Sequence, residues 1–386
     1  MSPTGRPRAD LPRKILLLRL RRLGDVILTT PAITLLKQAF PAASLTYLVE
    51  EPFRRLVEGN PHLDRVLAIP AKQKTSELIA LIRSIRREGY DVLLDFHGGP
   101  RASWITLLGG ARLKVGYAIK GKGFLYDIRV PRSGERGPVH SVENHANLVK
   151  AVVAEFADAA KHSSAEISRG PSAAEANPQT RPGAPVAAPA AVPPLLLPEP
   201  TAGEKDRVRA LLHEAFGPDA AGSSLVVLHV GAGNRFRDWG AENLTALASR
   251  LVRAAKARVA LIGAEGDRAV EERVRAAAPE SILPCCGRLN LMETREIIRR
   301  ADLFAGPDSG PMHLAASTPT PIVAWFGPTL PANFAPWRPD GGPTVILERA
   351  LSCRPCEQRG CVASDFRCLQ SISPDDVFES CRPFLL

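Results

Sequence analysis

Short apolar runs alternate with segments of helical periodicity along the first half of the chain. The run from Lys14 to Leu20 predicts a buried strand, and Val26 to Phe40 has the periodicity of a helix, with Pro31 near its start or at a kink. Further strands are predicted at 45–49, 65–69 and 91–96, and a further helix at 77–87. Strands that alternate with helices predict a parallel sheet with right-handed crossovers.

The same alternation returns in the second half of the chain. It predicts strands at 224–230, 258–262, 281–283, 302–305 and 321–326, and helices at 202–216, 241–255, 267–278 and 291–299. The intervening stretch is rich in Ala and Pro and favours a flexible, partly polyproline linker. We therefore predict two nucleotide-binding-type α/β domains, whose parallel sheets face a central cleft. The expected boundaries are 1–162 for the first domain, 163–200 for the linker and 201–386 for the second domain.

Positive charge is concentrated in the first half of the chain. Residues 1–150 contain 25 Lys and Arg against 13 Asp and Glu, a balance of +12, whereas the whole chain has a net charge of +10. Such asymmetry favours an anionic partner: nucleic acid, a phosphorylated glycolipid or a membrane face. The alternative interpretation of this charge is a basic surface that is simply solvated and has no specific partner. Because the basic residues are not interleaved with aromatic residues for base stacking, nucleic acid is not the partner we expect.

The sequence contains no stretch that approaches the ~20 apolar residues of a membrane span. The apolar stretch Ile15–Leu18 is too short for a secretory signal, so we expect a cytoplasmic protein that can touch a membrane surface. All seven cysteines lie after residue 284, and their odd number argues against a disulfide framework.

The segment Gly306–Ala316 follows a predicted strand and opens a helix. Asp308 and Ser309 are good N-cap residue types, and Gly310 lets a ligand approach the backbone closely. A helix start offers free N–H groups and a partial positive charge, which suits a diphosphate, and His313 can face the cleft. The alternative is a merely well-capped helix with a buried histidine.

Two loops after predicted strands offer further ligand-binding side chains. Arg237 lies in a glycine-containing loop before Trp239, and its guanidinium suits bidentate contact with phosphate oxygens. The alternative interpretation is that Arg237 is a solvated arginine in a surface loop. Glu265 follows the strand that ends at Ile262, where an acidic residue commonly holds ribose hydroxyls. The alternative interpretation is that Glu265 is only a carboxylate at the start of a helix.

A carboxylate also marks the first strand-to-helix turn. Asp25 follows Gly24 and, if the turn faces the cleft, can accept a proton from an acceptor hydroxyl. The neighbouring Arg21 and Arg22 would keep it ionised and attract an anionic acceptor. The alternative is an ordinary helix-start aspartate.

Four cysteines near the C-terminus have the spacing C-x2-C-x4-C-x6-C. Cys353, Cys356, Cys361 and Cys368 could hold a structural zinc ion as four thiolates. The alternatives are an iron–sulfur cluster and free or reversibly paired thiols, and the spacing does not decide among them.

Two of these segments together resemble a known family. Residues 14–32, with Gly24-Asp25 and Thr30-Pro31-Ala32, and the segment Gly306–Ala316 look like the corresponding blocks of lipopolysaccharide heptosyltransferases, glycosyltransferase family 9. The cysteine-rich stretch also resembles a C-terminal segment of many members. The resemblance implies a GT-B fold with two Rossmann-like domains and inversion at the anomeric carbon. It implies an ADP-heptose donor and no catalytic metal. It also implies a Kdo-lipid A or lipopolysaccharide core acceptor at the cytoplasmic face of the inner membrane.

The resemblance also assigns roles by position. Asp25 corresponds to the catalytic base, and the donor-side positions are Arg237, Glu265, Asp308, Ser309, Gly310 and His313. Arg237 stands where members often have a phosphate-binding lysine. Asp95 and Arg101 resemble the acceptor-side segment, together with the basic Arg21 and Arg22, although His97 stands where the family usually has glutamine.

Two further functions remain open at this stage. One is a related glycosyltransferase with another nucleotide-sugar donor or glycan acceptor. The other is a non-catalytic protein that binds an anionic ligand, which the basic first half motivates.

Overall fold

The computed structural model describes residues 10–132, 137–167, 191–217 and 223–385. The chain divides into two compact units, and each unit is built from segments that are not contiguous in the sequence. The first unit comprises the residues up to Arg21, Thr29–Gly137 and Ser141–Pro193. The second comprises Arg22–Leu28, Pro138–His140 and Pro194–Leu386. The short segment that carries Asp25 thus belongs to the second unit, whereas the sequence interpretation assigned it to the first domain.

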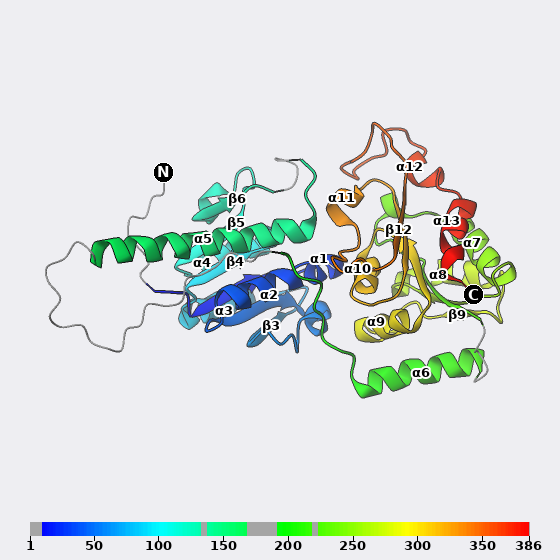
Figure 1. The fold of residues 1–386 in the computed structure, drawn as a ribbon, viewed down its shortest axis with the longest axis horizontal. Coiled ribbons are helices and arrows are strands. Elements are labelled where there is room, and N and C mark those ends of the chain that lie inside the picture. Colours follow the sequence, from blue (N-terminus) through cyan, green and yellow to red (C-terminus); the bar gives the residue numbers. More distant parts are fainter. Residues whose placement is uncertain (1–9, 133–136, 168–190, 218–222, 386) are drawn as a thin grey trace. The chain divides into compact units, whose positions relative to one another are not determined.

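The first unit is a parallel six-stranded sheet between two helical layers (Figure 1). Its strand order is β3-β2-β1-β4-β5-β6, the doubly wound order of nucleotide-binding folds. Helices α2 and α5 contact each other on one face, and α3 and α4 share a core on the other. The elements are β1 (Lys14–Leu18), α2 (Thr30–Ala39), β2 (Ser44–Glu50), η1 (Glu51–Leu56), β3 (Arg65–Ile69), α3 (Thr75–Glu88), β4 (Val92–Asp95), α4 (Pro100–Leu108), β5 (Leu113–Tyr117), η2 (Gly123–Leu125), β6 (Ile128–Val130) and α5 (Ser141–Ile167).

The single helix predicted from Val26 to Phe40 is two helices in the structure. A short helix, α1 (Leu23–Ile27), precedes α2, and Pro31 is the second residue of α2. Proline has no N–H to donate to the carbonyl of Ile27, and its ring clashes with that carbonyl, so a continuous helix is broken there. This break allows α1 to pack with the second unit.

The second unit repeats the architecture of the first. Its parallel strands have the order β12-β11-β10-β7-β8-β9, which is again the doubly wound order when counted from β7. Two parallel-sheet units confirm the predicted α/β architecture. The elements are α6 (Ala202–Phe216), β7 (Leu225–His229), η3 (Arg235–Arg237), α7 (Ala241–Arg253), β8 (Arg258–Ile262), η4 (Glu265–Asp267), α8 (Arg268–Arg275), β9 (Ile282–Pro284), α9 (Leu291–Arg300), β10 (Leu303–Pro307), α10 (Gly310–Ala316), β11 (Ile322–Phe326), α11 (Pro331–Phe334), β12 (Thr344–Glu348), α12 (Arg367–Gln370), α13 (Pro374–Cys381) and η5 (Arg382–Phe384).

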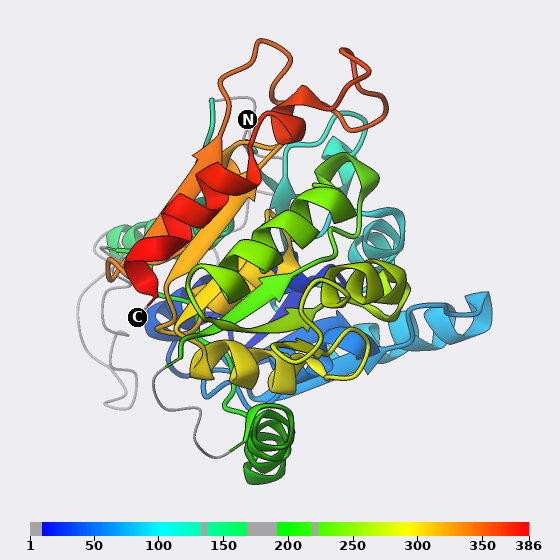
Figure 2. The same cartoon turned by 90° about the vertical axis from the view of Figure 1, so that its right-hand side faces the viewer.

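Helices α7, α8 and α13 cover one face of this second sheet. Figure 2 shows α7 and α13 side by side, and these helices contact each other. The core beneath them contains Trp239 and Trp325, whose ring centroids lie 4.7 Å apart. The Trp239 indole N–H donates to the carbonyl of Ile372 at 2.9 Å, so the C-terminal segment is fixed to the loop that follows β7.

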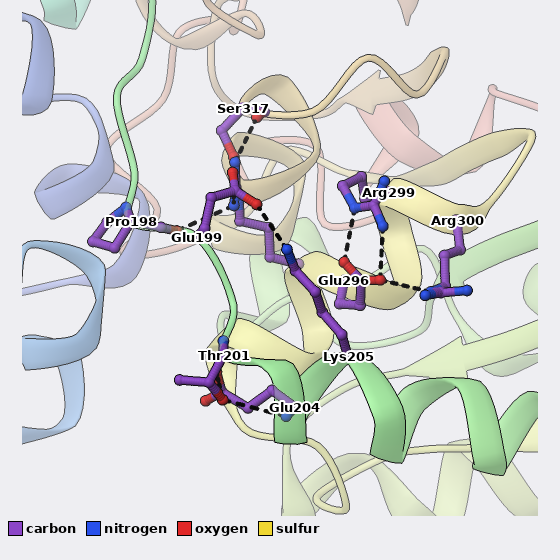
Figure 3. Close-up of polar contacts among 10 residues, drawn as sticks. Pro198, Glu199, Thr201, Glu204, Lys205, Glu296, Arg299, Arg300 and Ser317 are labelled. Atoms are coloured by element: carbon purple, nitrogen blue, oxygen red, sulfur yellow. Dashed lines mark hydrogen bonds and ion pairs between the residues drawn. The ribbon is translucent and has the colours of Figure 1, made fainter. Parts of the chain in front are cut away.

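The segment that enters the second unit is tied to α9 and to the residue after α10 by partly buried polar contacts (Figure 3). Arg295 on α9 donates to the carbonyl of Pro198 at 3.1 Å and pairs with Glu199 at 3.2 Å. The same side chain donates to the hydroxyl and carbonyl of Ser317, the residue after α10, at 3.2 and 3.3 Å. One buried guanidinium therefore joins the incoming chain to the end of α10.

Residues 168–190 of the predicted linker lie outside the described residues. Helix α5 continues to Ile167, five residues past the boundary expected at 162, so the start of the predicted linker is helical. Within the described part of the chain, no helix combines the length and the apolar character that a bilayer crossing requires.

Candidate active site

A cavity of about 660 Å³ lies at the C-terminal ends of β7, β8 and β10 in the second unit. Strands β7 and β10 are neighbours at the point where the strand order reverses, which is where doubly wound sheets bind ligands. All residues that line the cavity belong to the second unit, including those of α1. Its volume is that of an ordinary small-molecule site.

Helix α1 forms one wall of this cavity by packing closely against α10. A Cβ on Gly24 would lie 2.6 Å from Cδ2 of His313, and a Cβ on Gly310 would lie 2.6 Å from Cδ2 of Leu23. Both distances are shorter than real carbon contacts, so only glycine permits this approach at either position. The two glycines place α1, and with it Asp25, directly beside α10.

Asp25 lines the cavity from α1. Its Oδ2 accepts a hydrogen bond from the backbone N–H of Arg22 at 3.1 Å, which closes the first turn of α1. Asp25 is therefore both a helix-start aspartate and a residue of the cavity wall. Arg22 lines the same cavity, whereas Arg21 belongs to the first unit.

Arg237 and Asp308 form an ion pair in the cavity wall. Nη1 of Arg237 lies 3.2 Å from Oδ2 of Asp308, and Nε donates to Gln358 at 3.2 Å. Asp308 is buried and also accepts from the Thr329 hydroxyl at 2.5 Å. Burial raises the pKa of Asp308, Arg237 and Thr329 oppose that rise, and Asp25 adds to it. Asp308 thus orients the guanidinium, while Nη2 of Arg237 has no protein partner among the described residues.

Ser309 bonds to a histidine instead of capping α10. Its hydroxyl lies 3.0 Å from the Pro307 carbonyl and 3.1 Å from Nδ1 of His229. If the hydroxyl donates to the carbonyl, His229 must donate from Nδ1, which leaves Nε2 as an acceptor. Burial lowers the pKa of His229 to about 3, so the ring is neutral. His229 also lines the cavity, and sequence reasoning missed it.

His313 is a buried neutral side chain in the cavity wall. Burial lowers its pKa to about 3; His140 and Arg237 lower it as well, and Asp25 raises it. Its Nδ1 has no hydrogen-bond partner in the described structure. Asp25 thus acts electrostatically on both Asp308 and His313, and the imidazole offers a neutral polar group to a ligand.

Glu265 does not line the cavity. Its side chain is exposed and pairs with Arg268 at 3.0 Å, so the structure supports the helix-start reading of this residue. Asp267, two residues later, is the carboxylate in the cavity wall, and it accepts from the Ala264 N–H at 2.7 Å. The loop after β8 therefore places Asp267 in the cavity wall, and the donor contact expected of Glu265 stays a prediction.

The predicted acceptor-side residues of the first unit are held by internal contacts. Asp95 is fully buried, where it accepts from the N–H groups of His97 and Gly98 at 2.8 Å each and from the Tyr126 hydroxyl at 2.7 Å. Burial raises the pKa of Asp95. In the structure this carboxylate shapes the loop after β4, and its expected contact with the acceptor stays a prediction.

Arg101 and Arg21 both approach the buried Glu50. Arg101 forms an ion pair with this carboxylate and donates to the Pro70 carbonyl at 3.0 Å. Arg21 lies 4.0 Å from Glu50, with 58% of its side chain exposed. Two guanidinium groups share one carboxylate, so an excess positive charge remains at this edge of the first sheet.

The four C-terminal cysteines of the C-x2-C-x4-C-x6-C motif lie close enough together to influence one another electrostatically. Cys353, Cys356, Cys361 and Cys368 are free thiols and partly exposed. Burial is the main reason why the pKa of Cys368 is raised, and the other three cysteines contribute. Among the residues that the structure describes, no three His, Cys, Asp or Glu side chains are arranged to hold a metal ion. Zinc binding by these four cysteines therefore stays a prediction from the sequence.

Comparison with known sequences identifies the family. The sequence profile of glycosyltransferase family 9 (heptosyltransferase) matches residues 78–366. Lipopolysaccharide heptosyltransferase 3 of Escherichia coli is 24% identical over 322 residues, which cover 81% of this chain and 83% of that protein. Lipooligosaccharide heptosyltransferase 2 of Campylobacter jejuni is 34% identical over 100 residues, but this match spans only 26% of this chain and 31% of that protein.

Solved structures show the same fold. A family 9 glycosyltransferase from Veillonella parvula superposes with a TM-score of 0.72 and 20% identity, over 97% of both chains. The ADP-heptose lipopolysaccharide heptosyltransferase II of E. coli gives a TM-score of 0.69 and 18% identity, over 96% of this chain and 98% of that one. The fold is therefore of the GT-B type. The chain belongs to glycosyltransferase family 9, the heptosyltransferases, and is a glycosyltransferase.

Proposed function

We propose that this glycosyltransferase transfers heptose from ADP-heptose to the inner core of a lipopolysaccharide precursor, with inversion at the anomeric carbon. The observation that carries the proposal is that one cavity contains both kinds of group such a transfer needs. Asp25 supplies a carboxylate, and Arg237 supplies a cation positioned by Asp308. The relatives named above are heptosyltransferases, which supports the choice of sugar.

In the proposed reaction, the Asp25 carboxylate accepts the proton of an acceptor hydroxyl. The acceptor oxygen forms a bond to the anomeric carbon as the bond from that carbon to the diphosphate breaks. The electron pair of the broken bond leaves with ADP, and Arg237 stabilises the developing negative charge. Neutral His313 and His229 add polar contacts without adding positive charge.

The proposed acceptor is Kdo-lipid A or a lipopolysaccharide core, at the cytoplasmic face of the inner membrane. The excess charge of the first 150 residues and the arginine pair at Glu50 support an anionic acceptor. We propose a cytoplasmic location with peripheral contact to that membrane, and a transfer step that requires no metal ion.

The test is the variant Asp25→Asn, assayed for ADP release from ADP-heptose with Kdo-lipid A as acceptor. Asparagine keeps the size of the side chain but cannot accept the proton, so we expect turnover to fall roughly 10³-fold. Donor affinity measured by calorimetry should stay nearly unchanged. The matched control is Asp206→Asn on the exposed surface of α6, which should behave as wild type. If Asp25→Asn retains most of its turnover, Asp25 is not the base.

The second candidate is transfer from a different nucleotide sugar. The position of Glu265 favours this alternative, because the residue expected to bind the ribose is exposed and lies outside the cavity wall. Thermal-shift measurements with ADP-, GDP- and UDP-sugars separate the two cases. A clear preference for a non-adenine nucleotide would replace ADP-heptose as the donor.

A further inference from the structure

Helix α4 in the first unit is apolar on its outer side as well as its inner side. Its buried residues include Ala102 and Ile105, which join the core under the sheet. On the outer side, Trp104 is 55% exposed and Leu108, one turn later, is 43% exposed. Large apolar side chains exposed together on one side of a helix mark an interaction surface, so the outer side of α4 is expected to have a partner.

A second apolar group projects from the element beside α4. The short helix η2 contacts α4, and its Phe124 is 74% exposed. Lys122, just before η2, bonds to the carbonyl of Gly98 just before α4, which fixes the two elements together. Trp104, Leu108 and Phe124 form what we call the apolar trio.

Three arginines flank the apolar trio from α3. Arg83, Arg86 and Arg87 are exposed and have the i, i+3, i+4 spacing that puts them on one side of a helix. A Cβ on Gly110 would lie 3.0 Å from Cγ of Arg86, so α3 passes close to the end of α4. Figure 2 shows α3 and α4 on the same side of the first unit.

The arginine charges are not neutralised within the described part of the protein. Glu88, the acid at the end of α3, pairs with Lys14 and Arg65. Glu77, at its start, accepts from the Lys74 N–H at 2.9 Å. None of the three arginines has an acidic partner among the described residues. An uncovered apolar centre therefore lies beside an unbalanced cationic rim.

We propose that the outer side of α3, α4 and η2 docks on the surface of an anionic lipid bilayer. Tryptophan, phenylalanine and leucine enter the boundary between headgroups and acyl chains, while arginines beside them bind anionic headgroups. A second copy of this chain fits less well, because self-association would bring the arginines of two copies together. The lipid-linked acceptor of the proposed function supplies the biological reason for such docking, and the surface itself is assigned from these side chains.

The experiment measures co-flotation of the full chain with vesicles of phosphatidylglycerol and phosphatidylcholine, without donor or acceptor. The triple variant R83Q/R86Q/R87Q should weaken partitioning about a hundredfold, since each arginine near an anionic surface contributes about fivefold. The charge-matched control is R253Q/K256Q/R275Q in the second unit, which should lose less than about threefold. Equal losses in both triple variants would show diffuse charge attraction and overturn the assignment.

The apolar part is tested by W104S/L108S/F124S, which should weaken partitioning at least about tenfold. Val362→Ser, at an exposed valine of the second unit, is its control and should have no effect. Equal binding of wild type to purely zwitterionic vesicles, or a dimer that W104S/L108S/F124S dissociates in sedimentation velocity, would overturn the proposal. Transfer to a water-soluble acceptor should be unchanged in both triple variants, so membrane docking and the proposed function can be refuted separately.

Discussion

The close approach of α1 to α10 makes Gly24→Ala an informative perturbation. The added methyl group would lie 2.6 Å from Cδ2 and 3.3 Å from Nε2 of His313. Carbon atoms in contact are normally about 3.6 Å apart, so α1 and α10 must separate by about 1 Å. A misplacement of about 1 Å at a reacting group costs about 10²-fold in rate. We therefore expect kcat for ADP release to fall about a hundredfold.

The effect on stability should be much smaller than the effect on activity. Overpacking costs about 1–3 kcal/mol, whereas replacing glycine by alanine in a helix returns up to about 1 kcal/mol. The free energy of unfolding, measured with urea, should thus fall by about 2 kcal/mol or less. A folded enzyme with a misplaced Asp25 is the expected result.

Gly203→Ala is the matched control for this variant. Gly203 is also the second residue of its helix, α6, but a Cβ there would meet no atom within 4 Å. It should retain full activity and gain up to about 1 kcal/mol of stability. Gly310→Ala probes the same contact from the α10 side and should mimic Gly24→Ala. A Gly24→Ala variant that keeps more than about a third of the wild-type kcat would show that the contact between α1 and α10 does not position Asp25. A 1 Å displacement should leave only about a hundredth of the wild-type kcat.

Two further predictions concern the charged and titratable groups of the cavity. Arg237→Ala should reduce kcat about 10²–10³-fold, because it removes the cation that we propose to stabilise the leaving diphosphate. Arg235→Ala, two residues earlier and outside the cavity wall, should have little effect in the same assay. In the folded state the pKa of His313 is lowered to about 3. Between pH 3 and about 6.5 the unfolded state therefore binds a proton that the folded state does not. The free energy of unfolding must rise with pH across that window. At pH 5 the neutral, buried His313 lowers the free energy of unfolding by about 2 kcal/mol. When urea unfolding is measured at pH 5 and pH 7, His313→Gln should therefore lose about 2 kcal/mol less stability on acidification than wild type. Identical losses in the two proteins would contradict the lowered pKa of His313.

Elements with strong local signals could be predicted from the sequence almost to the residue. The strands Arg65–Ile69 and Arg258–Ile262 and the helix Ala202–Phe216 have the predicted bounds. In the helix, Thr201 and Glu204 form a capping box, which fixes the first residue. Apolar runs of five residues between polar turns leave little choice of register.

Elements with weak or interrupted patterns were missed. The strand β6 has no fully buried residue, and β12 has only Leu347, so neither gives a clear apolar run. Helix α13 did have a signal in the sequence: Ser373 and Asp376 form a capping box just before the apolar Val377.

The candidate site was predictable in part. Motifs at the ends of strands identified Asp25, Arg237, Asp308 and His313, because ligands bind there in parallel sheets. The pairing of Asp308 with Arg237, and the position of Asp267 but not Glu265 in the cavity wall, depend on distances that no local pattern contains. His229 had a detectable signal, since it is a polar residue at the end of an otherwise apolar strand.

The membership of α1 in the second unit affects how enzymes of this kind can be recombined. In the gene, α1 is encoded with the first unit, but in space Leu23 and Gly24 fit against Gly310 and His313 of the second. A chimera spliced at the Ala/Pro-rich stretch would therefore combine α1 of one parent with α10 of the other. Exchanging the units between parents by such splicing requires that these four positions be transplanted as one set.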